Sequence, residues 1–125
     1  MEKKVINYRN DVEKYIELKY EVSPEYLWKK FPSFAIFRHK LNRKWFALFA
    51  CVEYEKVGVK KLGKVDILNV KLDDYLLVDA LIHQNGFAPA YHMQKERWIT
   101  VLLDGSVPLD KIENFIDISY ENTTK

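Results

Sequence analysis

Cysteine, glycine and proline are scarce in this chain of 125 residues, and each shortage excludes a class of protein. The single cysteine, Cys51, cannot form an internal disulfide, which excludes a disulfide-stabilised scaffold. Four glycines and four prolines are too few for a collagen-like or linker-like chain. The longest uninterrupted apolar run, residues 45–52, has eight residues. A membrane-spanning helix needs about 20.

The N-terminus and the lone cysteine predict where the protein works. The N-terminus is basic, but it lacks the apolar stretch and the small-residue cleavage site of a signal peptide. Cys51 stands inside the longest apolar run, where we expect an inert, buried thiol. These features predict a cytoplasmic protein that does not associate with a membrane.

The composition is that of a folded domain, with 48% hydrophobic, 14% aromatic and 30% charged residues. This excludes a disordered chain, and the length allows a core without metals or disulfides. We find no internal repeat and no linker, so residues 1–125 are expected to form a single domain.

Charge is distributed unevenly along the chain, although the net charge is only +2. Residues 38–64 contain eight basic and two acidic residues, while the remainder is net acidic. The basic members flank two expected turns and are Arg38, Lys40, Arg43, Lys44, Lys56, Lys60, Lys61 and Lys64. This pattern is compatible with an anionic partner, but charge alone favours the alternative, which is the ordinary solvated surface of hairpin loops.

Apolar periodicity and capping residues predict an α+β domain. Helices are expected at 2–20, at 23–31, between 73 and 86, and from Pro108 onward. Strands are expected at 35–39, 44–52, 59–62, 65–70 and 97–103, with a short strand opening at Tyr91. Adjacent antiparallel strands with helices on one sheet face make a two-layer α/β sandwich.

The details of two helices follow from the same patterns. In the third helix we expect Asp73 as the N-cap, Gly86 as the end, and a buried stripe of Leu76, Leu77, Ala80 and Leu81. In the last helix we expect Ser106 as the cap and an inner face of Ile112, Phe115, Ile116 and Ser119.

The strand expected at 44–52 is apolar on both faces. Trp45, Ala47, Phe49 and Cys51 alternate with Phe46, Leu48, Ala50 and Val52. Helices cover one face of a two-layer domain, so the other face either meets a partner or is covered by a loop or a curl of the sheet.

Six segments resemble linked signatures of one family. They are FPSFAIFRH at 31–39, KWFAL at 44–48, VDILNVK at 65–71, GFAPAYHM at 86–93, WITVLLDGSVP at 98–108 and DISY at 117–120. In this order and spacing they resemble the YjbR/MmcQ family over about residues 23–120. The resemblance implies a secretion-chaperone-like, CyaY-like fold ordered helix, three strands, helix, two strands, helix. Members are commonly labelled DNA-binding because the fold resembles a double-wing domain, and the family has no established catalytic residues to carry over.

Catalytic and metal motifs are not found in the sequence. There is no G-x-S-x-G elbow and no glycine-rich phosphate loop. His39, His83 and His92 lack the spacing of zinc ligands, and we expect hydrogen-bonded structural histidines. Glu13, Glu17 and Glu21 share a helix face, but neighbouring lysines argue against an acidic iron-binding ridge. We therefore expect no metal and no cofactor.

Asp66 is unusual because aspartate is disfavoured inside an apolar strand. We expect it to be paired with Arg97, Arg38 or a lysine. The alternative is a polar pocket formed by Asp66, Asn69, His92 and Lys95.

The sequence thus supports two functional hypotheses from different classes. The first is a non-catalytic module that binds double-stranded DNA through two basic hairpins, driven by phosphate contacts. The second is a protein-interaction or chaperone-like module, or a homodimer, that uses an apolar sheet face. An enzyme is the third alternative, and it would need a deep pocket containing Asp66 and His92.

Overall fold

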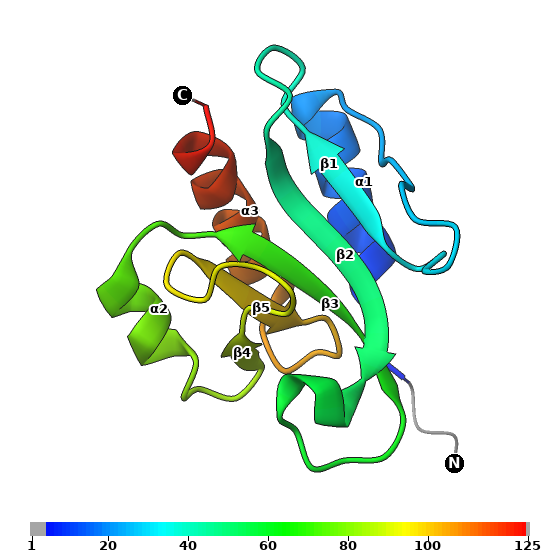
Figure 1. The fold of residues 1–125 in the computed structure, drawn as a ribbon, viewed down its shortest axis with the longest axis vertical. Helices are drawn as coiled ribbons and strands as arrows, with labels where there is room; N and C mark the ends of the chain where they lie inside the picture. The colour runs from blue at the N-terminus through cyan, green and yellow to red at the C-terminus, as the bar shows by residue number, and fades with distance from the viewer. Residues whose placement is uncertain (1–4, 125) are drawn as a thin grey trace.

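The computed structural model describes residues 5–124 and has one five-stranded antiparallel sheet with three α-helices (Figure 1). In chain order the elements are α1 Arg9–Tyr20, β1 Ala35–Arg38, β2 Trp45–Glu53, a 3-10 helix Tyr54–Val57, β3 Lys64–Lys71, α2 Tyr75–Leu81, β4 Phe87–Pro89, β5 Trp98–Leu102 and α3 Leu109–Asn122. The strands lie in the order β1-β2-β3-β5-β4. This confirms the expected α+β fold and its element order.

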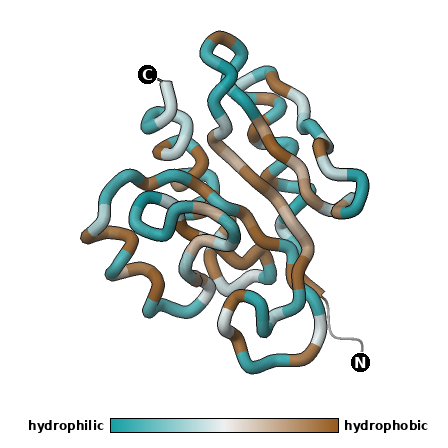
Figure 2. The backbone as a smooth tube through the Cα atoms, in the orientation of Figure 1, coloured by the Kyte–Doolittle hydropathy of each residue, from teal (hydrophilic) through white to brown (hydrophobic). Residues whose placement is uncertain are grey.

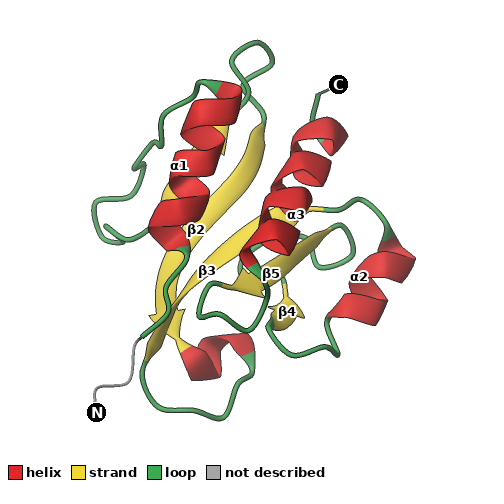
Figure 3. Cartoon of the chain, turned by 180° about the vertical axis from the view of Figure 1, so that it is seen from behind, coloured by secondary structure: helices red, strands yellow, loops and turns green. Residues whose placement is uncertain are grey.

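The helices α1 and α3 lie together on one face of the sheet, as Figure 3 shows from behind. From α1, Val12 and Ile16 point into the core. From α3, the expected inner face of Ile112, Phe115, Ile116 and Ser119 is fully buried, which confirms that prediction. Figure 2 shows hydrophobic residues concentrated along the central strands.

A bulge sits where β1 and β2 begin to pair. Phe37 pairs with Ala47 but Arg38 pairs with Trp45, so Phe46 has no partner on β1. The bulge turns Phe46 toward the helices, where its ring makes edge contacts with Tyr20 and Tyr120. Trp45 is left half-buried at the margin of the sheet.

Loops cover much of the sheet face that has no helices. A second core cluster joins Ala50, Val52 and Ile67 of the strands to Tyr54 and Val57 of the 3-10 helix. Phe34, Val59 and Tyr91 pack against it from the connecting segments. The two-faced strand is therefore covered by the chain's own loops, which was one of the two outcomes expected.

The predicted helix at 23–31 is wrong. This segment is extended, and Glu25 forms a bridge with Ile36 that adds a short pairing beside β1. Two consecutive turns follow, closed by the amide of Phe31 on the carbonyl of Trp28 and by that of Phe34 on Phe31. The aromatic residues at 28, 31 and 34 thus have helical spacing without a helix.

Other boundaries also differ from the predictions. Residues 2–4 of the first predicted helix lie outside the described residues, and α1 begins at Arg9. The predicted strand at 59–62 is part of a loop, because the chain turns through the 3-10 helix instead. The predicted strand opening at Tyr91 is a turn, and the edge strand is β4, which ends two residues earlier.

The N-cap, the end and the buried residues of α2 differ from the predictions. The N-cap is Asp74, whose side chain accepts from the amide of Leu77, while Asp73 has a left-handed backbone. The helix buries Val78 and Leu81, whereas Leu76 and Ala80 are exposed. Gly86 lies beyond the helix end, where a Cβ would be 2.6 Å from Val107.

Ser106 does not cap α3. Its hydroxyl donates to the Asp104 carboxylate at 2.5 Å, and Asp104 also accepts from the Tyr54 hydroxyl. Pro108 precedes the first helical residue and has no capping side chain. These bonds lower the pKa of Asp104 against the opposing effect of its burial. Ser106 therefore stabilises the β5–α3 turn rather than the helix terminus.

His39 is a buried structural histidine, as expected. Its Nε2 lies 2.7 Å from the Thr123 hydroxyl, and its ring packs on Tyr120. Burial lowers the pKa of His39 below its ordinary value of 6.5. The unfolded chain therefore binds a proton more readily than the folded protein.

We expect the stabilisation from neutral His39 to be present above about pH 6.5 and to be lost as the pH falls toward the folded-state pKa. Urea unfolding of the wild type and of His39→Gln at pH 7.5 and pH 5.5 measures this. The advantage of the wild type should shrink at the lower pH. Glu13, whose pKa is raised by burial, titrates in both proteins and cancels in the difference. A difference that is independent of pH would contradict this assignment.

Candidate functional site

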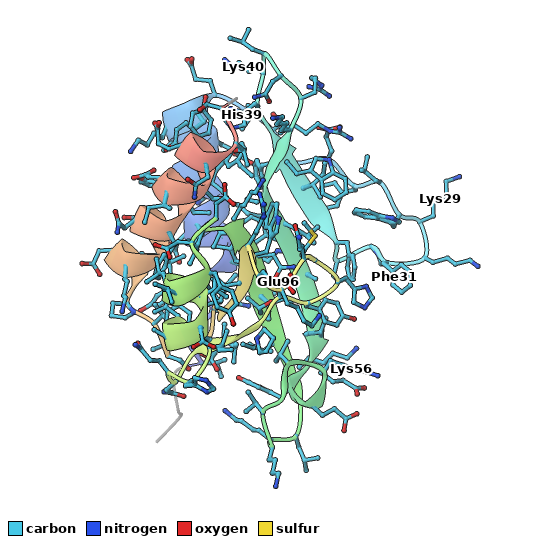
Figure 4. All side chains as sticks on the ribbon, turned by 60° about the vertical axis from the view of Figure 1, so that its left-hand side comes forward. Lys29, Phe31, His39, Lys40, Lys56 and Glu96 are labelled. Atoms are coloured by element: carbon cyan, nitrogen blue, oxygen red, sulfur yellow. The ribbon has the colours of Figure 1, made fainter. Side chains whose placement is uncertain are left out.

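The basic residues named from the sequence lie in two groups at opposite ends of β2 (Figure 1). One group surrounds the turn between β1 and β2, and the other surrounds the loop between β2 and β3. The strand has nine residues, so its two ends are about 26 Å apart at a rise of about 3.3 Å per residue, and the two groups lie beyond these ends. Figure 4 shows Lys40 at one end of the molecule and Lys56 toward the other.

The first group is partly neutralised by glutamates of the 21–34 segment. Arg38 and Arg43 both contact the Glu25 carboxylate, at 3.0 and 3.6 Å. Lys40 pairs with Glu21 at 3.5 Å, a solvated contact of little energetic weight. Lys44 is exposed, and within residues 5–124 it forms no ion pair. The turn therefore keeps a positive charge.

The second group consists of Lys56, Lys60, Lys61 and Lys64. All four are exposed, and in the described part of the chain none forms an ion pair. The Lys61 ammonium lies 4.8 Å from the centre of the Tyr54 ring. Each group also carries a protruding leucine, since Leu41 is 98% exposed and Leu62 is 97% exposed.

Between the two basic groups, the sheet face opens into an aromatic pocket of about 330 Å³. Its walls come from three segments and are Trp28, Phe31, Phe34, Trp45, Leu48, Tyr91, His92 and Met93. The turns at 28–34 supply three of these rings, the start of β2 supplies Trp45 and Leu48, and the turn after β4 supplies the rest. The sequence alone does not reveal this pocket, because residues 23–31 have the pattern of a helix.

The sheet separates Asp66 from the other members of the predicted polar pocket. Asp66 is on the helix side, where Arg9 Nη1 contacts it at 2.8 Å and Asn7 donates to it at 2.7 Å. Asn69 is on the other side and donates to the Tyr91 carbonyl. Lys95 donates to the Ala90 carbonyl at 3.1 Å.

The pairing of Asp66 is confirmed, but its partner is Arg9 rather than Arg97, Arg38 or a lysine. Arg9 also donates to the Ser33 carbonyl at 2.6 Å and stacks over Phe49. The side chains of Arg9 and Asp66 are 14% and 16% exposed. This ion pair therefore joins α1, β3 and the 21–34 segment.

The remaining candidate groups do not assemble a reactive site within residues 5–124. His92 is exposed and stacked on Tyr91, and His83 is exposed on a loop. No group of three or more His, Cys, Asp or Glu residues in this range is placed to hold a metal ion. Cys51 is half-buried rather than buried, and desolvation raises the pKa of its thiol.

No helix of residues 5–124 is long and apolar enough to cross a membrane.

Comparison with known proteins identifies the family of this α+β domain. The YjbR family model matches residues 18–122, and the chain belongs to that family. The uncharacterised protein YyaQ of Bacillus subtilis is 39% identical over 115 residues, covering 92% of this chain and 97% of YyaQ. The family resemblance noted in the sequence is therefore confirmed. Neither match carries evidence of a catalytic activity.

Solved structures agree with the fold. A crystal structure of a Pseudomonas syringae protein has a TM-score of 0.88 at 40% identity, covering 92% of this chain and 97% of that one. A crystal structure of a Deinococcus radiodurans protein has a TM-score of 0.70 at 21% identity, covering 96% and 80%. The second likeness concerns the fold alone.

Removing the Asp66 carboxylate should destabilise the domain, because Arg9 would keep a charge with little access to water. We expect Asp66→Ala to cost about 1–3 kcal/mol of unfolding free energy. Arg9→Met should cost a similar amount, and the double variant should cost less than the sum. Urea unfolding measures all three, with Asp79→Ala as an exposed control. An unchanged midpoint for Asp66→Ala would contradict a structural role.

Proposed function

We propose that this protein is a cytoplasmic, non-catalytic module that binds double-stranded DNA through its two basic loops. The observation that carries the proposal is the position of the two groups beyond the two ends of β2, which are about 26 Å apart. One turn of B-form DNA is about 34 Å long. Two loops with this separation match phosphates about one helical turn apart on the same side of a duplex.

The charge distribution supports phosphate contacts. Residues 21–64 contain ten basic and four acidic residues, while the rest of the chain is net acidic. The second group has exposed ammonium groups without ion pairs in the described chain, so binding a phosphate there breaks no existing ion pair. Such contacts position a protein on DNA but carry no sequence information directly. Binding is therefore expected to be salt-dependent and of low sequence specificity.

The alternative function is a protein-interaction module, or a homodimer, that uses the uncovered part of the sheet face. The observation that favours it is the aromatic pocket, whose rim residue Phe31 is 52% exposed. Trp45 is half-buried at the same place, whereas Trp98 is buried and offers no exposed patch. Aromatic residues in partly open pockets are common anchors in protein interfaces.

DNA binding is tested by titrating a labelled 20-base-pair duplex at several salt concentrations. With about 4–6 phosphates contacted, the logarithm of affinity should fall against the logarithm of salt with a slope of roughly −4 to −5. Scrambling the sequence should change the affinity little. Lys60→Glu with Lys61→Glu should abolish binding at about 0.1 M salt, because attraction becomes repulsion. Lys14→Glu with Lys111→Glu makes the same charge change on exposed helix positions and should bind like the wild type apart from a small loss.

Duplex length tests the two-loop geometry separately. A duplex of about six base pairs spans roughly 20 Å and reaches only one basic group, so its salt slope should be about half that of the longer duplex. Equal slopes would contradict the two-loop arrangement. Absent binding of the long duplex at about 0.05 M salt would overturn the proposal and favour the protein-interaction function.

A further inference from the structure

The walls of the aromatic pocket are mostly rings, and pairs of these rings meet edge to face. Trp28 meets Trp45 with centroids 5.8 Å apart at 89°, and Phe34 meets Tyr91 at 6.4 Å and 72°. In an edge-to-face pair, the edge of one ring covers one face of the other, so the ring that supplies the edge keeps both of its faces free of that partner. A pocket of about 330 Å³ lined by such rings has room for one planar heterocycle.

The surroundings of the pocket are cationic. Lys29 and Lys30 are exposed at the centre of the turn whose ends, Trp28 and Phe31, line the pocket. Lys44 directly precedes Trp45 and is exposed. Figure 4 shows Lys29 and Phe31 projecting from the same loop on the side away from α3.

Carboxylates do not oppose this charge at the pocket wall. No acidic residue is among the described residues that line it. Glu25, the acid of the neighbouring segment, is already engaged by Arg38 and Arg43. Arg38 also lies over the Trp45 ring, 5.8 Å from its centre. The site thus combines ring faces for a planar group with cations for an attached anion.

We propose that this pocket binds an unpaired base of a single-stranded nucleic acid, with the flanking phosphates directed to Lys29, Lys30 and Lys44. An apolar peptide would use the rings but not the cations, and a duplex would use the cations but not the rings, because its bases are stacked within the helix. Alternating aromatic and basic residues are the combination that single-strand binding sites use. The proposal rests on nucleic-acid binding as the proposed function and adds a second site to it, which shares Lys44 with the first basic group.

The test measures the affinity of a labelled oligothymidylate of about ten nucleotides by fluorescence anisotropy. Phe31→Ala should weaken binding by roughly fivefold or more, since stacking on one aromatic ring contributes about this much or more. Tyr26→Ala is the matched control, because Tyr26 is an exposed aromatic residue of the same segment outside the pocket wall, and it should bind like the wild type. Phe31 is half exposed, so its replacement leaves the core intact.

Two further measurements complete the test. The first distinguishes binding of the base from binding of the phosphates, and the second distinguishes the base pocket from duplex binding by the basic loops. An abasic oligonucleotide of equal length should bind at least fivefold more weakly than oligothymidylate and should fail to quench tryptophan fluorescence. Phe31→Ala should leave duplex affinity within about twofold, whereas Lys60→Glu with Lys61→Glu should abolish duplex binding. Equal affinity for the abasic strand, or no effect of Phe31→Ala, overturns the base pocket while leaving duplex binding to be judged by its own salt slope. Quenching by an aromatic peptide and not by oligothymidylate overturns it in favour of protein interaction.

Discussion

The constraint on which this structure depends is that β2 is apolar on both faces. Ala47 and Phe49 face the helices, while Leu48, Ala50 and Val52 face the other way, and all five are buried. The helices α1 and α3 cover one side, and α2 packs into the same core cluster, so within residues 5–124 no α-helix covers the other side. The 21–34 segment, the 3-10 helix and the turn after β4 cover that side instead. Because loops pack less completely than helices, the cover leaves an aromatic pocket between them.

Much of the fold could be predicted because its signals are local. The spacing of Ile112, Phe115, Ile116 and Ser119 predicts a buried helix face, and α3 has that face. The helix predicted at 23–31 is wrong because Ser23 and Pro24 have the local pattern of a helix start and Pro32 that of a helix end, although the segment is extended. The bridge between Glu25 and Ile36 favours the extended form, and such pairing depends on a strand that lies distant in sequence.

The charged residues of the candidate site could be predicted from the sequence, but the residues that they contact could not. Lys40 and Lys44 flank the β1–β2 turn, which has a local sequence signal, whereas Lys60 and Lys61 lie on a loop where a strand was expected. The partner of Asp66 is Arg9, 57 residues away, and an ion pair of this kind is set by how α1 crosses the sheet. The aromatic pocket draws on three separate segments, so no single stretch of sequence contains its signal.

Glu25 connects the electrostatics of the first basic group with the aromatic pocket. Its carboxylate holds Arg38, which lies over Trp45, and its backbone pairs with Ile36, which fixes the start of the 21–34 segment. The same residue therefore positions a wall of the pocket and lowers the net charge of the β1–β2 turn. The second basic group has no equivalent carboxylate pair in the described chain, so its lysines remain the more available cations. This asymmetry leaves the lysines beyond β2 more accessible to an anionic partner than the arginines near β1, which Glu25 engages.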